Sequence, residues 1–475
     1  MKLSVSNEKF YDEVLLIVKL FFSESELETI NLNYDITYGF VGSTLNAKIK
    51  IDGEYNNETI SEEINNSFNF SKQQMLKCDK YTKRHLKIML YNYLSNLTGK
   101  QLPWGSLTGI RPTKLFYELK QELGNSILAK NELIKTFKVS KEKAETAWEV
   151  TKNQSKMEIN DNLIDLYLNI PFCTSKCYYC SFISLPIAQC QQYVEPYVEA
   201  LIKELKAVKE IINKKNYFVK TIYIGGGTPT ALSAEQLDRI LKELTYPVSE
   251  FTVEAGRPDT ITKEKLDVLK KHRVTRISIN PQTFSNKTLR EIGRAHTADD
   301  VIACYNLAKP YGFSINMDLI AGLSNESFNT FKKSLTKTLE LKPDNITVHT
   351  LSVKRTSKLS EGEGEKGSEQ EVVKMVDYAY ATLTKNGYNP YYLYKQKNMV
   401  GNLENIGYSV KGKECLFNID SMEEVATVIA VGANAITKRF FSLQNRIERN
   451  ANVKNLNDYI TRIDEIIAKK QEFFK

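Results

Sequence analysis

The feature that most constrains the fold is an alternation of short β-branched runs with amphipathic helical stretches between about residues 166 and 353. Six runs have the composition of strands: LYLNI (166–170), TIYIGG (221–226), FTVEA (251–255), RISIN (276–280), INMDLIAG (315–322) and NITVHTL (345–351). Such an alternation predicts an α/β fold with a parallel sheet and crossover helices. The sheet could close partly into a barrel or lie open and doubly wound, and periodicity does not decide. Either way, ligands are expected at the carboxyl ends of the strands.

The segments on either side of this core differ from it, and 475 residues are too many for one compact domain. The first part contains the strand-like run NAKIKIDG (46–53) and a helical stretch from Lys77 to Leu97. The charged, glycine-containing stretch SEGEGEKGSEQE (360–371) predicts a linker. The predicted domains are an α/β N-terminal domain over 1–155, the core over 160–358 and a small C-terminal domain over 368–475.

Composition predicts an ordinary globular protein, with 42% hydrophobic and 26% charged residues. The apolar run VLLIVKLFF (14–22) is short and contains Lys19, so we expect neither a membrane span nor a signal peptide, and a cytoplasmic location. The net charge of +8 is small for this length. It would suit an acidic substrate or RNA, but a solvated surface is the favoured interpretation.

Three of the seven cysteines, Cys173, Cys177 and Cys180, fall in CTSKCYYC directly after the first predicted strand. An odd and clustered set argues against a disulfide framework and favours a soft metal site. Structural zinc needs a fourth ligand, and only Cys190 follows nearby. A [4Fe–4S] cluster held by three cysteines would leave one iron open to a cofactor. Zinc remains the alternative.

A cysteine triplet with this spacing after a first strand resembles the signature of the radical S-adenosylmethionine (SAM) superfamily. The resemblance implies a [4Fe–4S] cluster on Cys173, Cys177 and Cys180, whose open iron binds SAM. It further implies that one electron from the cluster cleaves SAM to a 5′-deoxyadenosyl radical, and that Tyr179 lies against the adenine.

Later strand ends carry a glycine-rich turn, GGGTPT (225–230), and several polar residues. The glycines offer a backbone edge that a ligand can approach closely. The polar residues are Glu254, Gln282, Arg294 and Asp318. Acids are unusual in buried parallel strands, so Glu254 and Asp318 are candidates to hold ribose hydroxyls. Arg294 is a candidate partner for the SAM carboxylate.

The order of these motifs resembles the oxygen-independent coproporphyrinogen III dehydrogenase (HemN-like) family. The flanks GSLTGIRPTKL (105–115), NPYYLYKQKNMVGNLENIGYS (389–409) and RIERNANVKN (446–455) resemble its HemZ branch. The resemblance implies a partial (β/α)6 TIM-type barrel that binds one or two SAM molecules near the cluster. The implied SAM contacts are Tyr167, Tyr179, Gly226, Gly227, Thr228, Glu254, Gln282, Arg294, Asp318 and Ser352.

Two positions depart from the dehydrogenase pattern. Asn169 stands where that family has a histidine, and Phe182 stands where it has an additional cysteine. Phe182 is shared with the heme-chaperone (HemW-like) branch. That branch carries a C-terminal histidine, and the corresponding place here is Gly401-Asn402.

The function implied by the resemblance is oxidative decarboxylation of coproporphyrinogen III propionates to vinyl groups in heme biosynthesis. The expected partners are a porphyrinogen or heme-type small molecule and an electron donor such as flavodoxin or ferredoxin. Candidate cations for the substrate carboxylates are Lys354, Arg355, Lys395, Lys397 and Arg439.

Two alternatives stay open. One is a heme-binding chaperone, with Met399, Tyr408 or Cys415 as the ligand in place of histidine. The other is a radical enzyme on another substrate, such as heme or RNA. The sequence has no aromatic RNA-binding motif, and nucleic acid is not an expected partner.

Overall fold

The computed structural model describes residues 2–22, 26–27, 30–56, 58–109, 111–154, 159–180, 184–352, 368–396 and 399–475. The chain divides into two compact units, Met1–Trp148 and Glu149–Lys475. Within the described ranges, no helix has both the length and the apolar composition needed to cross a membrane.

The first unit is a four-stranded sheet with helices on one face. Its strands follow the order β1 (Lys2–Val5), β2 (Asn31–Val41), β3 (Thr44–Tyr55) and β4 (Glu58–Asn69). Exposed and buried residues alternate along β2 and β3, so one face is apolar and needs a cover. Helices α1 (Tyr11–Phe21) and α4 (Cys78–Thr98) share its core. The predicted strand at 46–53 and helix at 77–97 are confirmed.

Other helices described in this part of the chain are α3 (Lys72–Met75), α5 (Pro112–Leu123), α6 (Ser126–Lys135) and α7 (Lys141–Asn153), whose last residues belong to the second unit. Trp104, in the turn-rich stretch between α4 and α5, is fully buried. It therefore packs inside the unit and does not present a binding surface.

The second unit contains all six predicted core strands, and they pair side by side in chain order. These strands are β5 (Leu163–Ile170), β8 (Phe218–Gly226), β9 (Glu250–Val253), β10 (Arg276–Ser278), β11 (Ser314–Ala321) and β12 (Asn345–Thr350). Every neighbouring pair is parallel. Sequential order excludes the doubly wound sheet, in which the order reverses at a switch point. The barrel-type α/β fold is confirmed.

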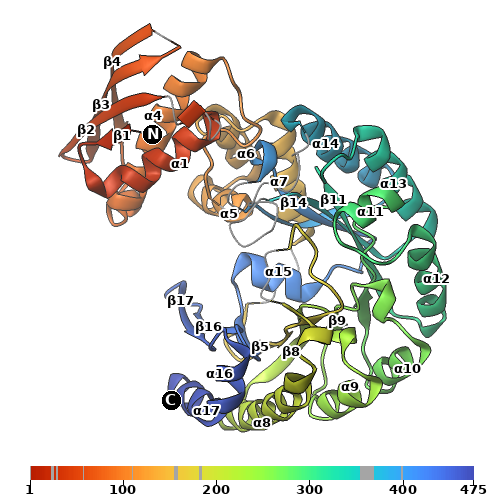
Figure 1. Ribbon diagram of the computed structural model, residues 1–475. Coiled ribbons are helices and arrows are strands. Elements are labelled where there is room, and N and C mark those ends of the chain that lie inside the picture. The colour runs from red at the N-terminus through yellow and green to blue at the C-terminus, as the bar shows by residue number, and fades with distance from the viewer. Residues whose placement is uncertain are drawn as a thin grey trace. The chain divides into compact units, whose positions relative to one another are not determined.

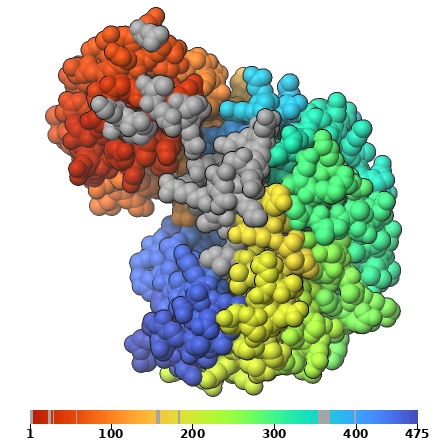
Figure 2. Space-filling view, in the orientation of Figure 1, coloured from red at the N-terminus to blue at the C-terminus, as the bar shows by residue number. Residues whose placement is uncertain are grey.

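Crossover helices cover the outer side of this sheet (Figure 1). They are α8 (Gln191–Lys215), α9 (Ala234–Leu241), α10 (Lys263–Lys271), α11 (Asn286–Glu291), α12 (Ala298–Ala308) and α13 (Phe328–Leu341). In Figure 2 the surface colour passes from yellow through green to blue-green, as strands wound in chain order require. All of these helices except α8 begin at a Ser or Thr side chain that caps the first turn: Ser233, Thr262, Ser285, Thr297 and Ser327.

The C-terminal residues extend both edges of the same sheet. Strand β15 (Thr427–Val431) pairs parallel with β5, and β14 (Asn405–Ser409) pairs antiparallel with β12. The remaining elements are α14 (Glu369–Lys385), β13 (Asn389–Tyr394), α15 (Leu416–Glu423), β16 (Ile436–Phe441), β17 (Arg446–Ala451), α16 (Leu456–Thr461) and α17 (Ile463–Phe473). The result is an open eleven-stranded sheet, and no pairing among the described strands closes it. A separate C-terminal domain over 368–475 stays a prediction, and most of the predicted linker lies outside the described residues.

A buried carboxylate fixes the edge of the sheet beside β5. Glu204 of α8 accepts hydrogen bonds from Tyr459 Oη (2.6 Å), Asn452 Nδ2 (2.8 Å) and Gly432 N (2.8 Å). Lys470 of α17 lies 3.0 Å from its Oε1, and both side chains are almost fully buried. Four donors therefore satisfy one buried charge, which joins α8, α16 and α17 to the turn after β15.

Removing only the cation of this pair should be costly. Lys470→Met removes the cation of a buried ion pair and leaves Glu204 without its ionic partner, so we expect a loss of about 3–5 kcal/mol in the free energy of unfolding, measured by urea titration. Lys203→Met is the matched control. Lys203 lies on α8 next to Glu204, but it pairs with Asp464 in solvent. The Lys203→Met substitution should cost at most about 1 kcal/mol. Equal losses in the two variants would contradict this account.

Candidate functional site

The carboxyl ends of the parallel strands gather the predicted site residues at one edge of the sheet. Cys173 follows β5, Gly226 ends β8, Glu254 follows β9, and Asp318 lies in β11. The remaining positions follow the same rule: Gln282 lies beyond β10, where its backbone bridges to Leu319 of β11, and Ser352 lies just beyond β12. Because the strands run parallel and in chain order, residues far apart in sequence face one region.

The cysteine loop is attached to neighbouring segments by several hydrogen bonds. Thr228 Oγ1 donates to Cys173 Sγ (3.5 Å), and Cys180 N donates to Cys177 O (3.1 Å), which closes a turn. Tyr178 N donates to Ile292 O (3.2 Å). Burial raises the pKa of the Cys173 thiol, although the bond from Thr228 opposes this shift.

The chemistry of this loop fits a soft metal cluster. None of the three thiols forms a disulfide, and Cys177 is buried. The guanidinium of Arg257 lies 3.8 Å from Cys177 Sγ, so a cation faces a sulfur that would become a thiolate ligand. The described residues include no three His, Cys, Asp or Glu side chains already gathered around one point as a metal site. The ligand roles of Cys173, Cys177 and Cys180 therefore stay predictions.

The glycine edge after β8 packs directly against the end of β5. Gly226 has φ +105°, and a Cβ there would lie 2.1 Å from Asn169 Oδ1. Gly227 N donates to Ile170 O (2.8 Å), and Thr228 N donates to Phe172 O (2.7 Å). Only glycine permits both the backbone angle and the close approach. The edge therefore stands bare of side chains beside the cysteine loop.

The carboxyl group of Glu254 has a pKa close to neutral pH. Tyr223 Oη donates to its Oε1 (2.5 Å). Burial raises the pKa of Glu254 to about 7, although the bonds from Tyr223 and from the Gly226 backbone oppose the shift. Glu254 can therefore either donate or accept a hydrogen bond near neutral pH.

Asp318 lies in a different environment. Asn316 Nδ2 donates to its Oδ1 (2.8 Å), and His349 Nε2 lies 3.6 Å from its Oδ2. Burial alone would raise the pKa of Asp318, but the bonds from His349, Asn316 and Thr347 outweigh it and the pKa is lowered. Asp318 is therefore ionised and acts as an acceptor.

Arg294 and Gln282 bring unmet hydrogen-bonding groups to the site. Arg294 Nη1 donates to Asn280 O (2.6 Å), and Nη2 donates to Tyr179 Oη (3.3 Å). Gln282 has φ +64°, and its backbone N donates to Asp318 O (2.9 Å). Within the described chain, the buried polar atoms here that lack a hydrogen-bond partner include Arg294 Nε, Gln282 Oε1, Asn280 Oδ1 and Ser278 Oγ. Such a group fits a polar, charged ligand such as SAM.

The remaining predicted contacts have mixed positions. Tyr179 packs on the apolar cluster of Leu289, Ile292 and neighbours, next to Arg294. Tyr167 stacks with Tyr223 and with Phe417 of α15, and its hydroxyl donates to Asn169 Oδ1 (3.2 Å). Ser352 forms a β-bridge with Met399. The shared role of Tyr179, Tyr167 and Ser352 as SAM contacts stays a prediction.

Asn169, where the resemblance led us to expect histidine, has a structural task. Its Nδ2 donates to Ala433 O (2.6 Å), in the turn after β15. Tyr197 Oη donates to Asn169 O (2.6 Å) and accepts a bond from Ala433 N (3.1 Å). Asn169 thus ties the end of β5 to the C-terminal residues.

The predicted substrate cations divide into two groups. Lys354, Arg355 and Lys397, together with Phe182, lie outside the described residues. Lys395 is buried, and burial lowers its pKa to about 7, opposed by the nearby charge of Glu404. Arg439 of β16 donates to Phe473 O (3.2 Å) and lies over the Phe441 and Phe474 rings. Arg439 therefore serves packing.

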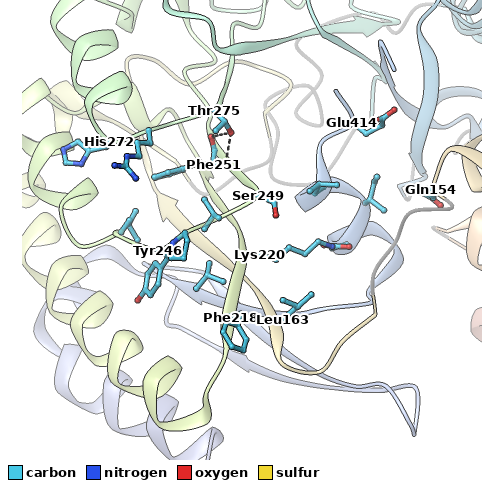
Figure 3. Close-up of a pocket in the computed structure, with 18 of the residues that line it drawn as sticks. Gln154, Leu163, Phe218, Lys220, Tyr246, Ser249, Phe251, His272, Thr275 and Glu414 are labelled. Atoms are coloured by element: carbon cyan, nitrogen blue, oxygen red, sulfur yellow. Dashed lines mark hydrogen bonds and ion pairs between the residues drawn. The ribbon is translucent and has the colours of Figure 1, made fainter. Parts of the chain in front are cut away.

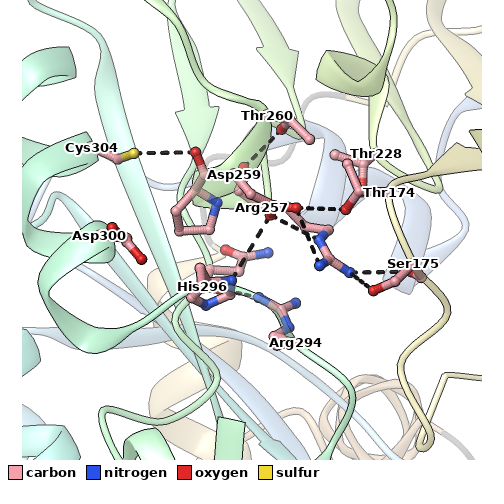
Figure 4. Close-up of polar contacts among 12 residues, drawn as sticks. Thr174, Ser175, Thr228, Arg257, Asp259, Thr260, Arg294, His296, Asp300 and Cys304 are labelled. Carbon is pink, nitrogen blue, oxygen red and sulfur yellow. Dashed lines mark hydrogen bonds and ion pairs between the residues drawn. The ribbon is translucent and has the colours of Figure 1, made fainter. Parts of the chain in front are cut away.

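Sequence reasoning missed Arg257 and Asp259, which contact the cysteine loop (Figure 4). Both stand in EAGRPD, immediately after Glu254. The rule that selected Glu254, a polar residue just beyond a parallel strand, applies equally to these two residues. The sequence therefore contained the signal.

A large hollow lies elsewhere in the second unit. It has a volume of about 1340 Å³ and is lined by the starts of β5, β8 and β9, including Leu163, Phe218 and Ser249 (Figure 3). These are the amino ends of the strands, opposite the cysteine loop. Ligands in this class of fold bind at the carboxyl ends, so this hollow is not the candidate site.

Comparison with known proteins agrees with this geometry. Residues 168–337 match the Radical SAM superfamily. The chain is 36% identical to the oxygen-independent coproporphyrinogen-III oxidase-like protein HemZ of Bacillus subtilis, over 99% of this chain and 97% of that protein. It is 37% identical to the heme chaperone HemW of Lactococcus lactis, over 47% of this chain and 60% of that protein.

Among solved structures, the chain is similar to coproporphyrinogen III oxidase (HemN) from Escherichia coli, a radical SAM enzyme. The TM-score is 0.52 at 23% identity, over 66% of this chain and 71% of that one. This likeness supports the fold.

The raised pKa of Glu254 predicts a pH-dependent contribution to stability. Between its ordinary value of 4.5 and about 7, the folded state binds the proton more tightly than the unfolded state. The contribution is therefore present at low pH and is lost as the pH rises through about 7. The melting temperature of the wild type should fall relative to that of Glu254→Gln between pH 5 and pH 8. Glu235→Gln, an exposed control on α9, should show no such trend, and a pH-independent difference for Glu254→Gln would contradict the assignment.

Proposed function

The chain belongs to the radical SAM superfamily, in the branch of oxygen-independent coproporphyrinogen III oxidase-like proteins that includes HemZ, and we propose that it converts propionate side chains of coproporphyrinogen III to vinyl groups without oxygen. Its cofactors are a [4Fe–4S] cluster and SAM, which this superfamily uses. The near full-length similarity to HemZ supports the substrate class.

The observation that carries the proposal is the set of groups at the strand ends. A three-cysteine loop, a bare glycine edge and buried unmatched polar atoms adjoin one another there. We assign Cys173, Cys177 and Cys180 to the cluster. The assigned SAM contacts are Tyr167, Tyr179, Gly226, Gly227, Thr228, Glu254, Gln282, Arg294, Asp318 and Ser352.

The chain's own residues would bind and orient the cofactor. The unpaired Nε of Arg294 and Oε1 of Gln282 are complementary to a carboxylate and an ammonium group. Asp318 is ionised and accepts hydrogen bonds, as ribose hydroxyls require. Glu254 holds or releases a proton near neutral pH at its carboxyl oxygens.

When bound, the two cofactors supply one-electron chemistry that removes a hydrogen atom from an unreactive C–H bond. For each propionate, one hydrogen atom leaves the carbon next to the ring, and the carboxylate leaves as carbon dioxide. One electron passes to a one-electron acceptor, and a carbon–carbon double bond remains. Two such steps convert coproporphyrinogen III to protoporphyrinogen IX.

A heme-binding role is the second candidate, because of the similarity to HemW over about half of this chain. Its predicted ligands are already occupied within the fold. Met399 Sδ accepts a bond from Gln396 N (2.9 Å), and Cys415 Sγ donates to Glu250 Oε1 (3.1 Å). Tyr408 is 1% exposed. Heme ligation by these three side chains would require rearrangement of buried contacts.

The decisive assay is anaerobic. Reconstituted protein receives dithionite and SAM, with and without coproporphyrinogen III, and 5′-deoxyadenosine, carbon dioxide and vinyl product are measured together. We expect porphyrinogen-dependent release of all three, and none from Cys177→Ala. A reconstituted protein that cleaves SAM but never forms carbon dioxide or vinyl product would contradict the proposal.

The same preparation tests the second candidate. Titration with heme should give no stoichiometric Soret shift if the protein is the decarboxylating enzyme. A saturable shift that Met399→Leu or Cys415→Ser abolishes, together with absent vinyl product, would favour the heme-binding role.

A further inference from the structure

Arg257, in the segment that follows β9, contacts the cysteine loop. It stands between β9 and the short 3-10 turn η4 (Pro258–Thr260), and it is 3% exposed. Its Nη1 donates to Ser175 O (3.1 Å) and Ser175 Oγ (3.0 Å), and lies 3.8 Å from Cys177 Sγ. One guanidinium therefore contacts two residues of the predicted cluster-binding loop, Ser175 and Cys177. Figure 4 shows the contact with Ser175.

The carboxylate of Asp259 fixes the orientation of this guanidinium. Arg257 Nε lies 3.1 Å from Asp259 Oδ1, and Nη2 donates to Oδ2 (3.4 Å). Thr174 Oγ1 also donates to Asp259 Oδ2 (2.7 Å). Burial would raise the pKa of Asp259, but the bonds from Arg257 and Thr174 outweigh it, so the carboxylate is charged. Together, Asp259 and Arg257 contact three residues of the loop: Asp259 contacts Thr174, and Arg257 contacts Ser175 and Cys177.

The pair is oriented with its positive end toward the sulfur. A second buried guanidinium, that of Arg294, lies next to His296 (Figure 4). His296 Nδ1 is 3.9 Å from Asp259 Oδ1, and burial lowers the pKa of this histidine to about 4, so it is neutral. Around Cys177 the described side chains therefore present cationic hydrogen-bond donors. A thiolate, and still more a reduced cluster, is stabilised by such donors.

We propose that Arg257 is a positioning residue for the iron–sulfur cluster, which fixes the loop between Cys173 and Cys180 and places a charged donor beside Cys177 Sγ. The proposal rests on the cluster in the proposed function and not on the porphyrinogen substrate. Arginine suits this task because its planar fork binds Ser175, Cys177 and Asp259 simultaneously, whereas lysine offers a single point charge.

Substitution of Arg257 should have two effects that can be measured separately. Loss of the fork should loosen the loop and reduce cluster uptake. Loss of the positive charge should disfavour addition of an electron to the cluster, because the reduced form carries one more negative charge, so the midpoint potential should become more negative. A merely structural residue would affect stability without changing the cluster's potential or spectrum.

The test compares Arg257→Met and Arg257→Lys with Arg276→Met. Arg276 is a matched control, because it is equally buried and pairs with Glu250 (3.3 Å), but it stands at the amino end of β10. Each variant is reconstituted anaerobically. The measurements are iron per chain, the electron paramagnetic resonance (EPR) spectrum after reduction, the midpoint potential and the circular dichroism melting curve.

We expect Arg257→Met to bind less than half the wild-type iron, with a more negative potential for the cluster that remains. Arg257→Lys should bind an intermediate amount and keep a potential closer to that of the wild type. Arg276→Met should melt earlier yet keep the wild-type iron content, spectrum and potential. Wild-type iron, spectrum and potential in Arg257→Met would overturn the proposal.

If Arg257→Met does not fold, Arg257→Lys decides the matter. A folded lysine variant with wild-type iron content and spectrum would overturn the role of the fork, and one with reduced iron and an altered spectrum would support it. None of these readouts needs a substrate. A failed porphyrinogen assay therefore leaves this proposal standing, and a failed iron assay leaves the substrate question open.

Discussion

The parallel, chain-order pairing of β5, β8, β9, β10, β11 and β12 is the constraint on which the rest of the structure depends. Parallel strands linked by outer helices must all end at the same edge. The cysteine loop, the glycine edge, Glu254 and Asp318 are therefore neighbours by topology, although about 140 residues separate the first from the last. A site assembled in this way needs each strand end to be held in register with the next one.

Much of the buried polar chemistry serves that register. Glu204, with four donors, fixes the turn after β15, and that turn holds Asn169 at the end of β5. At the opposite ends of the strands, Glu250 accepts bonds from Leu416 N and from Cys415 Sγ, which fixes α15 to the sheet. Buried charges of this kind are expensive unless fully satisfied, so both networks make the C-terminal residues part of the barrel unit.

In the cysteine loop, burial and hydrogen bonding have opposite effects on the pKa of the Cys173 thiol. The thiols of the loop must become anionic to bind iron, and burial opposes that change, as the raised pKa of Cys173 indicates. Hydrogen bonds from Thr228 and from the Arg257 guanidinium work in the opposite direction. Residues that follow β8 and β9 therefore provide the hydrogen bonds that would stabilise thiolates in this loop.

Sequence patterns predicted the elements well, because six β-branched runs separated by capped amphipathic helices have few alternatives. They did not predict the order of the strands, since periodicity carries no information about pairing. The contact of Asn169 with Ala433 and the bonds of Arg257 to the cysteine loop were not predicted either. Both depend on which way a side chain turns at a strand end, and partners 264 and 80 residues apart leave no local signal.

The measurement that tests the central claim most directly is the EPR spectrum of the reduced, reconstituted protein before and after addition of SAM. The account predicts a reduced [4Fe–4S] signal that shifts when SAM is added, because a cluster held by only three cysteines would leave one iron open to SAM. The signal should be lost in Cys177→Ala. Zinc in place of iron, or a cluster spectrum that SAM does not change, would contradict the account.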